Sequence, residues 1–276
     1  MTTPRPRRRP VRPGAVVPRA DRPVPRRNGS RRGGTRGEAA GTEAARQAGT
    51  EAGKQAGTET GTETGKAVAR RLARLYPRAH CSLDFGSPFE LLVATILSAQ
   101  CTDKRVNVVT GGLFSRWPTA AALAAAPQAD LETVIRSTGF FRAKARSIRG
   151  CCQGLLERHG GEVPRSLDDL VRLPGVGRKT ANVVLGSGFG QAAGVVVDTH
   201  VGRISRRLGL TRQTDPVRVE RNLMAVLPRR HWIAFSHRLI EHGRTVCTAR
   251  RPRCEVCPLA DLCPRVGVRL PTRRPG

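Results

Sequence analysis

The stretch LPGVGRKTANVVL, residues 173–185, places a proline and two glycines inside an otherwise apolar, helix-like run. A residue that precedes a proline avoids the α region, so the segment SLDDLVRL, which Ser166 can cap, must end its helix by Pro174. Gly175 and Gly177 allow positive φ or close backbone approach, and RKTANVVL then resumes helical spacing. The sequence therefore predicts two helices joined by a tight glycine turn.

This hairpin, residues 167–186, has the backbone groups of an anion site. The N–H groups of the turn and of the second helix's N-terminus lack intrahelical partners and converge on one point. Such a site holds a phosphate without reading a base sequence. Because glycine turns between helices are common, this interpretation depends on the rest of the chain.

The chain is basic along its whole length. Among its 276 residues, 49 are Lys or Arg and 21 are Asp or Glu, which gives a formal net charge of +28. Residues 1–66 hold 15 of the basic and 6 of the acidic residues, so residues 67–276 still carry +19. This excess favours a polyanionic partner, with nucleic acid first and an anionic membrane surface second.

The sequence contains no membrane signal that we recognise. No apolar run approaches the roughly 20 residues of a spanning helix, and no apolar segment follows the arginine-rich N-terminus. We therefore expect a soluble cytoplasmic protein without a membrane partner, associated with the nucleoid if it is bacterial.

The composition changes near residue 66. Residues 1–37 are almost entirely Arg, Pro and Gly, which predicts disorder because burial could not offset the entropy of ordering them. Residues 41–65 repeat GTEAARQA, GTEAGKQA and GTET, and each glycine costs a helix about 1 kcal/mol relative to alanine. We expect residues 1–65 to be a disordered, basic, low-complexity leader that ends in a flexible linker.

Helical patterns begin at Lys66 and continue to the C-terminus. We find no convincing period-two run between them, so the folded part is predicted to be all-α. The run PFELLVATILSAQ is apolar nearly all round, which predicts a buried central helix. The clearest predicted helices span residues 67–75, 88–100, 142–160, 216–227 and 231–243, the last ending at a glycine.

Lys179 and Asp198 are the candidate catalytic residues. A lysine attacks as the neutral amine, and a helix N-terminus, the neighbouring Arg178 and burial would each favour that form. Asp198 follows an apolar run and opens a helix, which it can cap through the amide of His200 or Val201. The alternatives are an ordinary DNA-facing or solvent-facing lysine and a purely structural cap. We expect His200 to be a packing or hydrogen-bonding residue.

Four cysteines crowd the C-terminus with the spacing C-x6-C-x2-C-x5-C. In a reducing compartment such crowding indicates a metal or cluster site better than disulfides. Four thiolates hold either tetrahedral zinc or an iron–sulfur cluster, and the geometry does not choose between them. The four are Cys247, Cys254, Cys257 and Cys263.

These three motifs together resemble the endonuclease III family of DNA-repair glycosylases. LPGVGRKTAN is similar to the family's helix-hairpin-helix, VDTH to its catalytic aspartate segment, and the cysteine spacing to its [4Fe-4S] site. The resemblance runs from about residue 66 to 270. It implies that Lys179 attacks the sugar C1′ and displaces a damaged base, that Asp198 assists, and that β-elimination then nicks the strand. The combination of lysine, aspartate and cluster implies oxidised pyrimidines and abasic sites as substrates.

The resemblance also implies how DNA is held. Glycosylases extrude the target nucleotide, and LSAQCTD and TGFFRAKA resemble the family's two wedge loops. They make Gln100 and Phe140 candidate gap-fillers, although Gln100 could simply end the buried helix and Phe140 could be core; Asp103 is a candidate pocket residue. The expected DNA-binding residues of the hairpin are Gly175, Val176, Gly177, Arg178 and Thr180.

By the same resemblance, the helices divide into two domains with a DNA groove between them. A six-helix barrel that carries the hairpin would span residues 81–191, and residues 66–80 with 192–270 would form the iron–sulfur domain. The expected partner is double-stranded DNA with damaged pyrimidines or abasic sites, bound by a monomer. The rivals are a noncatalytic DNA-binding module with a zinc-type cysteine knot and a membrane-surface protein driven by the basic tail.

Overall fold

The computed structural model describes residues 61–269. Two units can be distinguished, Met1–Ala48 and Gly49–Gly276, and the described residues all belong to the second. The expectations for residues 1–60 and for residue 270 therefore lie outside the described residues. Within residues 61–269 every regular element is a helix or helical turn, so the predicted all-α fold is confirmed.

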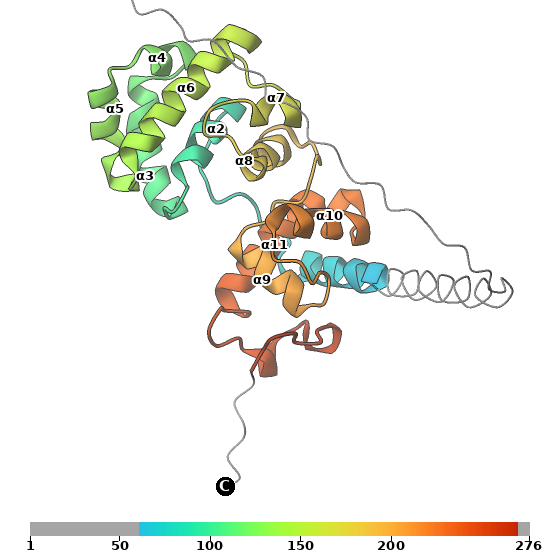
Figure 1. The fold of residues 1–276 in the computed structure, drawn as a ribbon. Coiled ribbons are helices and arrows are strands. Elements are labelled where there is room, and N and C mark those ends of the chain that lie inside the picture. Colours follow the sequence, from blue (N-terminus) through green and yellow to red (C-terminus); the bar gives the residue numbers. More distant parts are fainter. Residues whose placement is uncertain (1–60, 270–276) are drawn as a thin grey trace, which may run out of the picture. The chain divides into compact units, whose positions relative to one another are not determined.

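The first group of helices follows the chain from residue 88 to 188 (Figure 1). Two irregular turns interrupt it, the 3₁₀ turn η1 (Arg136–Thr138) and the π-helical turn η2 (Val184–Gly188). The α-helices are α2 (Pro88–Leu97), α3 (Asp103–Arg116), α4 (Ala120–Ala125), α5 (Gln128–Ile135), α6 (Phe141–His159), α7 (Leu167–Val171) and α8 (Arg178–Val183).

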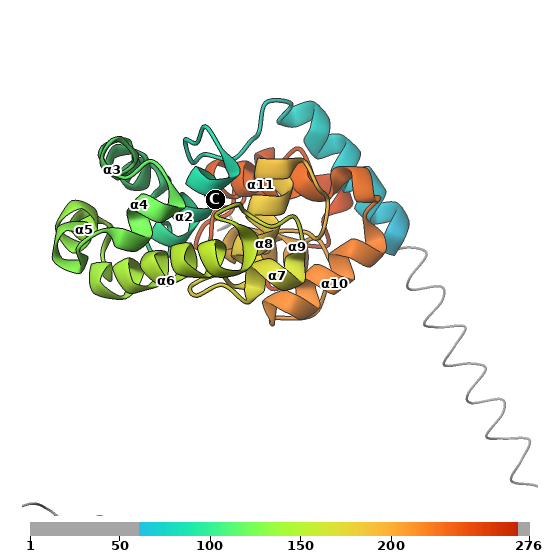
Figure 2. The ribbon, with the colours of Figure 1, turned by 90° about the horizontal axis from the view of Figure 1, so that it is seen from above.

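The second group combines the residue 61–75 helix with the helices after residue 198. Figure 2 shows α3 to α6 on the left and α10 with the residue 61–75 helix on the right, while α8, α9 and α11 lie between them. Its elements are α9 (Thr199–Arg207), α10 (Pro216–Val226), η3 (Arg229–His231), α11 (Trp232–Thr245), η4 (Cys254–Val256) and η5 (Ala260–Leu262).

Each group surrounds its own hydrophobic core. The first core takes residues from Leu83 to Leu185, and the second takes Val68, Ala69 and Leu72 together with residues from Val195 to Leu259. Every residue from 91 to 97 is buried, so α2 is the central helix that its apolar run predicts. Among the described residues, none of the helices has the length and apolar character needed to cross a membrane.

Three helix starts agree with the local sequence. Ser166 accepts the amide of Asp169 at the start of α7, and Asp215 accepts that of Arg218 at the start of α10. Asp198 accepts the amide of Val201 at 2.8 Å and so caps α9, as predicted. Each cap depends only on residues three apart, which is why the sequence reveals it.

Three predicted ends are wrong. Helix α2 stops at Leu97 and not at residue 100. Residues 61–65 are helical and not part of a linker, and Gly65 lies so close to the end of α10 that an added Cβ would stand 2.7 Å from the Val226 carbonyl. Helix α11 runs past Gly243 to Thr245. An added Cβ at Gly243 would lie 2.6 Å from His200 Nδ1 and 2.8 Å from Ile204 Cδ1, so this glycine lets α9 and α11 pack closely.

The two cores are joined by a buried ionic network. Glu220 of α10 accepts hydrogen bonds from Arg178 Nε at 2.6 Å and from Asn182 Nδ2 at 2.8 Å, both on α8. The side chain of Glu220 is only 4% exposed. An added Cβ at Gly194 would collide with the Glu220 carboxylate and lie 2.8 Å from the Asn182 amide.

We predict that Gly194→Ala destabilises the protein by roughly 1–3 kcal/mol, because the extra methyl group forces the Glu220 network apart. The measurement is the free energy of unfolding in urea. The control is Gly112→Ala in α3, where nothing lies within 4 Å of the added Cβ and the gain in helix propensity is worth up to about 1 kcal/mol. Equal stability of the two variants would contradict the packing argument.

Candidate active site

The hairpin folds as the sequence predicts. Gly175 adopts φ +77°, and an added Cβ there would lie 2.6 Å from Ser147 Cβ on α6. Two constraints, positive φ and close approach, therefore require glycine at this position. Gly177 caps α8 without a side chain, and nothing lies within 4 Å of where its Cβ would be. The backbone at the start of α8 is therefore uncrowded on the side where a Gly177 side chain would lie.

Lys179 and Asp198 line the same cavity. Its volume is about 690 Å³, and side chains packed on both cores contribute to its wall. Lys179 is the second residue of α8, and Asp198 is the N-cap of α9, so two helix starts meet here. One carboxylate oxygen of Asp198 is held by the Val201 amide, which fixes the direction of the side chain.

Two details of the lysine's expected environment are wrong. Lys179 is exposed to the cavity and not buried. The charge of Arg178 is directed away, because its Nε and Nη2 atoms donate to Glu220 at 2.6 and 3.2 Å. These hydrogen bonds also raise the pKa of Arg178. The protein alone therefore does not desolvate the lysine, although α8 still places it in a helix's first turn.

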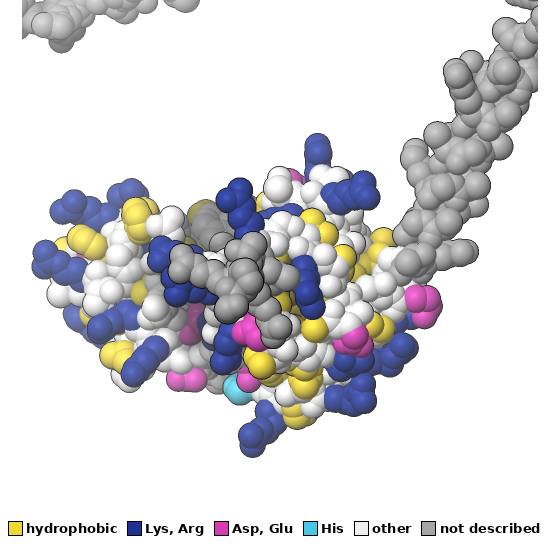
Figure 3. Space-filling model, turned by 90° about the horizontal axis from the view of Figure 1, so that it is seen from below, with side chains coloured by type: hydrophobic (Ala, Val, Ile, Leu, Met, Phe, Trp, Pro, Cys, Tyr) yellow, Lys and Arg dark blue, Asp and Glu magenta, His cyan; other side chains and the backbone are white. Residues whose placement is uncertain are grey.

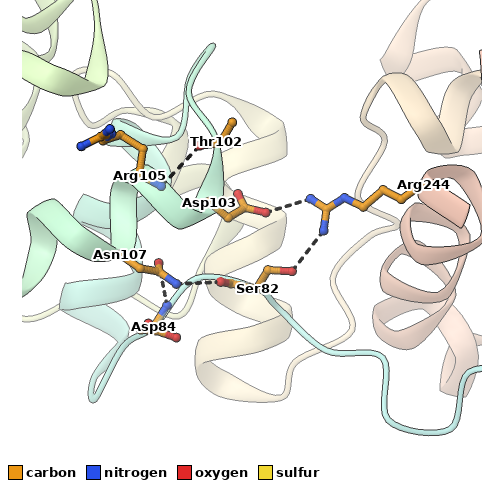
Figure 4. A network of polar contacts seen from close by, with 7 residues as sticks. All are labelled: Ser82, Asp84, Thr102, Asp103, Arg105, Asn107 and Arg244. Atoms are coloured by element: carbon orange, nitrogen blue, oxygen red, sulfur yellow. Dashed lines mark hydrogen bonds and ion pairs between the residues drawn. The ribbon is translucent and has the colours of Figure 1, made fainter.

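Asp103 lies at the start of α3 and lines the same cavity. Its carboxylate accepts a hydrogen bond from Arg244 Nη2 of α11 at 2.9 Å (Figure 4). Arg244 also donates to the Ser82 hydroxyl at 3.4 Å, while Asn107 donates to the Ser82 carbonyl and accepts the Asp84 amide. The network joins α3, α11 and the segment before α2 at the cavity wall.

Gln100 and Phe140 are both exposed and both adopt left-handed backbone conformations, with φ of 52° and 49°. Phe140 is 67% exposed, so it is not a core residue. Gln100 does not end the central helix, because α2 stops at Leu97. Non-glycine residues with positive φ are uncommon, and such strain is held only where the surrounding structure imposes it.

Several cavity residues were not predicted. His237 of α11 lines the cavity, and its Nε2 lies 3.2 Å from the Ser187 hydroxyl in the π-helical turn. Burial lowers the pKa of His237. Tyr76, Cys81 and Glu241 also contribute to the wall. No local pattern identifies these residues, because their role depends on which helices meet.

His200 packs rather than facing the cavity. Its Nδ1 lies 3.3 Å from Arg203 Nη2, beside the position where Gly243 leaves room. Burial lowers its pKa. This supports the expectation that His200 is a structural residue.

The four C-terminal cysteines line one common hollow. Arg207 of α9 donates to Cys247 Sγ at 3.2 Å, and its carbonyl accepts from Cys263 Sγ at 3.3 Å. Among the described residues, no group of three or more His, Cys, Asp or Glu side chains is arranged to hold a single metal ion. Burial and the neighbouring thiols raise the pKa of Cys257, so thiolates here need a compensating cation. The hollow's other walls include Ile204, Leu208, Val246 and Leu259, beside Cys247, Cys254, Cys257 and Cys263.

Lys and Arg side chains spread over the face drawn in Figure 3, and Asp and Glu side chains are scattered among them. The positive charge of the sequence is thus present on the folded surface. Such a surface attracts a phosphate backbone from a distance.

Comparison with known proteins identifies the family. Residues 93–229 match the HhH-GPD superfamily of base excision DNA repair proteins, and residues 247–263 match the iron–sulfur binding domain of endonuclease III. Endonuclease III of Synechocystis sp. is 58% identical over 190 residues, which are 69% of this chain and 87% of that protein. The chain belongs to the endonuclease III family. Endonuclease III of Bacillus subtilis is 49% identical over 68% of this chain and 86% of that protein.

Solved structures agree with this family assignment. A trapped covalent intermediate of endonuclease III with DNA is 47% identical and covers 71% of this chain and 92% of its own, with a TM-score of 0.68. A non-covalent endonuclease III–DNA complex matches equally well. The chain is therefore a bifunctional base excision repair enzyme, a DNA glycosylase with abasic-site lyase activity, and it carries a [4Fe-4S] cluster. The alternative of a noncatalytic zinc module is not favoured.

We predict that Cys257→Ser lowers the iron bound to this protein below one cluster per chain, because a hydroxyl is a poor iron ligand. The measurements are iron content and visible absorbance of the purified protein. Cys101→Ser is the matched control, since Cys101 lies in the loop before α3 and should leave both unchanged. A colourless wild-type protein that contains zinc would contradict the cofactor assignment.

Proposed function

We propose that Lys179 is the nucleophile and Asp198 its assisting carboxylate in an enzyme that removes oxidised pyrimidines from DNA. The observation that carries this proposal is that the two side chains line the same cavity, although Lys179 belongs to α8 and Asp198 caps α9 in the other group of helices. Both stand at helix starts that are fixed independently, α8 by the Glu220 network and α9 by the Asp198 cap.

The chemistry follows from these two groups. Asp198 accepts a proton from the Lys179 ammonium, and the free amine attacks the sugar C1′ while the bond from C1′ to the base breaks. The departing base takes up a proton. The C1′–O4′ bond of this adduct then breaks, and the ring oxygen takes up the proton that the amine releases, which gives the Schiff base. The Schiff base acidifies the sugar C2′ proton, and its removal expels the 3′ phosphate by β-elimination. A carboxylate beside C1′ also stabilises the positive charge that develops on the sugar.

The hairpin is proposed to hold a DNA phosphate. The turn from Gly175 through Val176 to Gly177 presents backbone amides, and α8 continues them through Arg178 and Thr180. The guanidinium of Arg178 is occupied by Glu220, so its contribution is the backbone amide. The open space beside Gly177 supports close approach of a phosphate.

Gln100 and Phe140 are proposed to fill the gap that the extruded nucleotide leaves in the stack, and Asp103 to border the pocket. Their exposure and imposed backbone conformations support the first assignment, and the shared cavity supports the second. The substrate is duplex DNA with a damaged pyrimidine or an abasic site, bound by a monomer in the cytoplasm, at the nucleoid if the cell is bacterial.

Cys247, Cys254, Cys257 and Cys263 are proposed to hold the [4Fe-4S] cluster. When bound, the cluster supplies four iron–thiolate bonds that tie the C-terminal segment together. Arg207 also ties this segment to α9, because it donates to Cys247 Sγ and to the carbonyls of Thr248 and Ala249. Two separate cores support two domains, residues 81–191 and residues 66–80 with 192–270.

We predict that Lys179→Gln abolishes the covalent adduct that borohydride traps on DNA containing an abasic site or an oxidised pyrimidine, because no amine remains to form the Schiff base. The measurement is the shifted band on a denaturing gel. Lys66→Gln is the control, since that lysine lies on the residue 61–75 helix and pairs with Glu63. Trapping by the Lys179 variant would disprove the assignment.

We predict that Asp198→Asn keeps the fold but lowers single-turnover excision by roughly 10²- to 10⁴-fold. Asparagine caps helices about as well as aspartate, so α9 retains its bond to the Val201 amide while the base is lost. Thermal unfolding and excision are measured on the same preparation. A parallel loss of stability and activity would assign Asp198 a purely structural role.

A further inference from the structure

Lys144 of α6 is a buried lysine that the proposed chemistry does not use. The residue is only 4% exposed. Its Nζ donates to the Leu97 carbonyl at 2.7 Å and to the Thr138 carbonyl at 2.8 Å. It does not line the cavity of Lys179. Burial lowers the pKa of Lys144, so the charged ammonium needs hydrogen-bond acceptors around it.

The two carbonyls are both the last of their helices. Leu97 ends α2, and Thr138 ends η1. The last carbonyls of a helix lack intrahelical donors and carry the negative end of the helix dipole. One ammonium therefore caps two helix ends at once, which satisfies both carbonyls and compensates its own burial.

Each capped carbonyl leads directly into a proposed wedge loop. Gln100 stands three residues after Leu97, and Phe140 stands two residues after Thr138. Both residues have positive φ, a strained conformation that persists only where the surrounding structure imposes it. Lys144 fixes the chain on the near side of both.

We propose that Lys144 is a positioning residue that holds the Gln100 and Phe140 loops at a fixed spacing, so that both enter the DNA stack together. The inference rests on the proposed function, because it assigns the two loops to extrusion of the nucleotide. Lys144 acts through the loops and touches neither the DNA nor the sugar. The spacing is set by two hydrogen bonds to one nitrogen atom, which leaves the loops little freedom to move apart.

The first test is independent of catalysis. In Lys144→Met the side chain keeps its length but loses its donors, so the amides of residues 99–102 and 139–141 should exchange hydrogen faster than in the wild type. Arg149→Met is the matched control, since Arg149 lies on the same helix and donates to the Ala124 carbonyl away from both loops. Unchanged exchange in the Lys144 variant would overturn the proposal.

The second test separates extrusion from chemistry. Lys144→Met should slow single-turnover excision from a paired duplex by roughly ten- to a hundredfold, but much less when the same lesion lies in a mismatched bubble, where no pair has to be broken. Arg149→Met should affect both substrates equally. Equal losses in the Lys144 variant would show a merely structural role and overturn the proposal.

A second variant guards against a folding failure. Lys144→Gln retains two amide donors without a buried charge, so it should fold where Lys144→Met does not and show a smaller difference between the paired and bubble substrates. If the wild-type enzyme excises neither substrate, the proposed function fails, while hydrogen exchange still decides whether Lys144 holds the loops.

Discussion

The site depends on the hydrogen bonds that the buried carboxylate of Glu220 accepts. It accepts hydrogen bonds from two residues of α8, while its own helix, α10, packs in the other core. The Glu220 side chain is only 4% exposed, so moving the two cores apart would leave its carboxylate buried without its hydrogen-bond donors, which is unfavourable. Because Lys179 follows Arg178 directly, the constraint that joins the cores also sets where the lysine stands.

The rest of the cavity combines helix starts that are fixed locally and that the Glu220 network brings together from the two cores. Each catalytic candidate stands at a helix start, and side-chain hydrogen bonds hold each start, from Arg178 and Asn182 to Glu220 for α8 and from the Val201 amide to Asp198 for α9. The Asp103–Arg244 ion pair adds a second tie between α3 and α11 at the cavity wall. It is partly exposed, so its contribution to stability is small and its contribution to geometry is the larger one.

Local features were predictable from the sequence, and long-range ones were not. The caps at Ser166 and Asp198 and the glycine hairpin each depend on residues a few positions apart, and the structure confirms them. The pairing of Arg178 with Glu220 spans 42 positions, and the bond from Lys144 to Leu97 spans 47. Nothing in the local pattern distinguishes Lys144 from an exposed lysine on a helix.

A glycine also shows that the local sequence does not reveal long-range contacts. The sequence predicts that the residue 231–243 helix stops at Gly243, but this glycine lies inside α11, where His200 and Ile204 occupy the space of a side chain. That contact limits the size of the side chain at residue 243, for a reason of packing and not of chemistry. Any larger residue pushes on His200 and Ile204 of α9, the helix that Asp198 caps, so the size of residue 243 constrains which variants of this enzyme keep the alignment of that carboxylate.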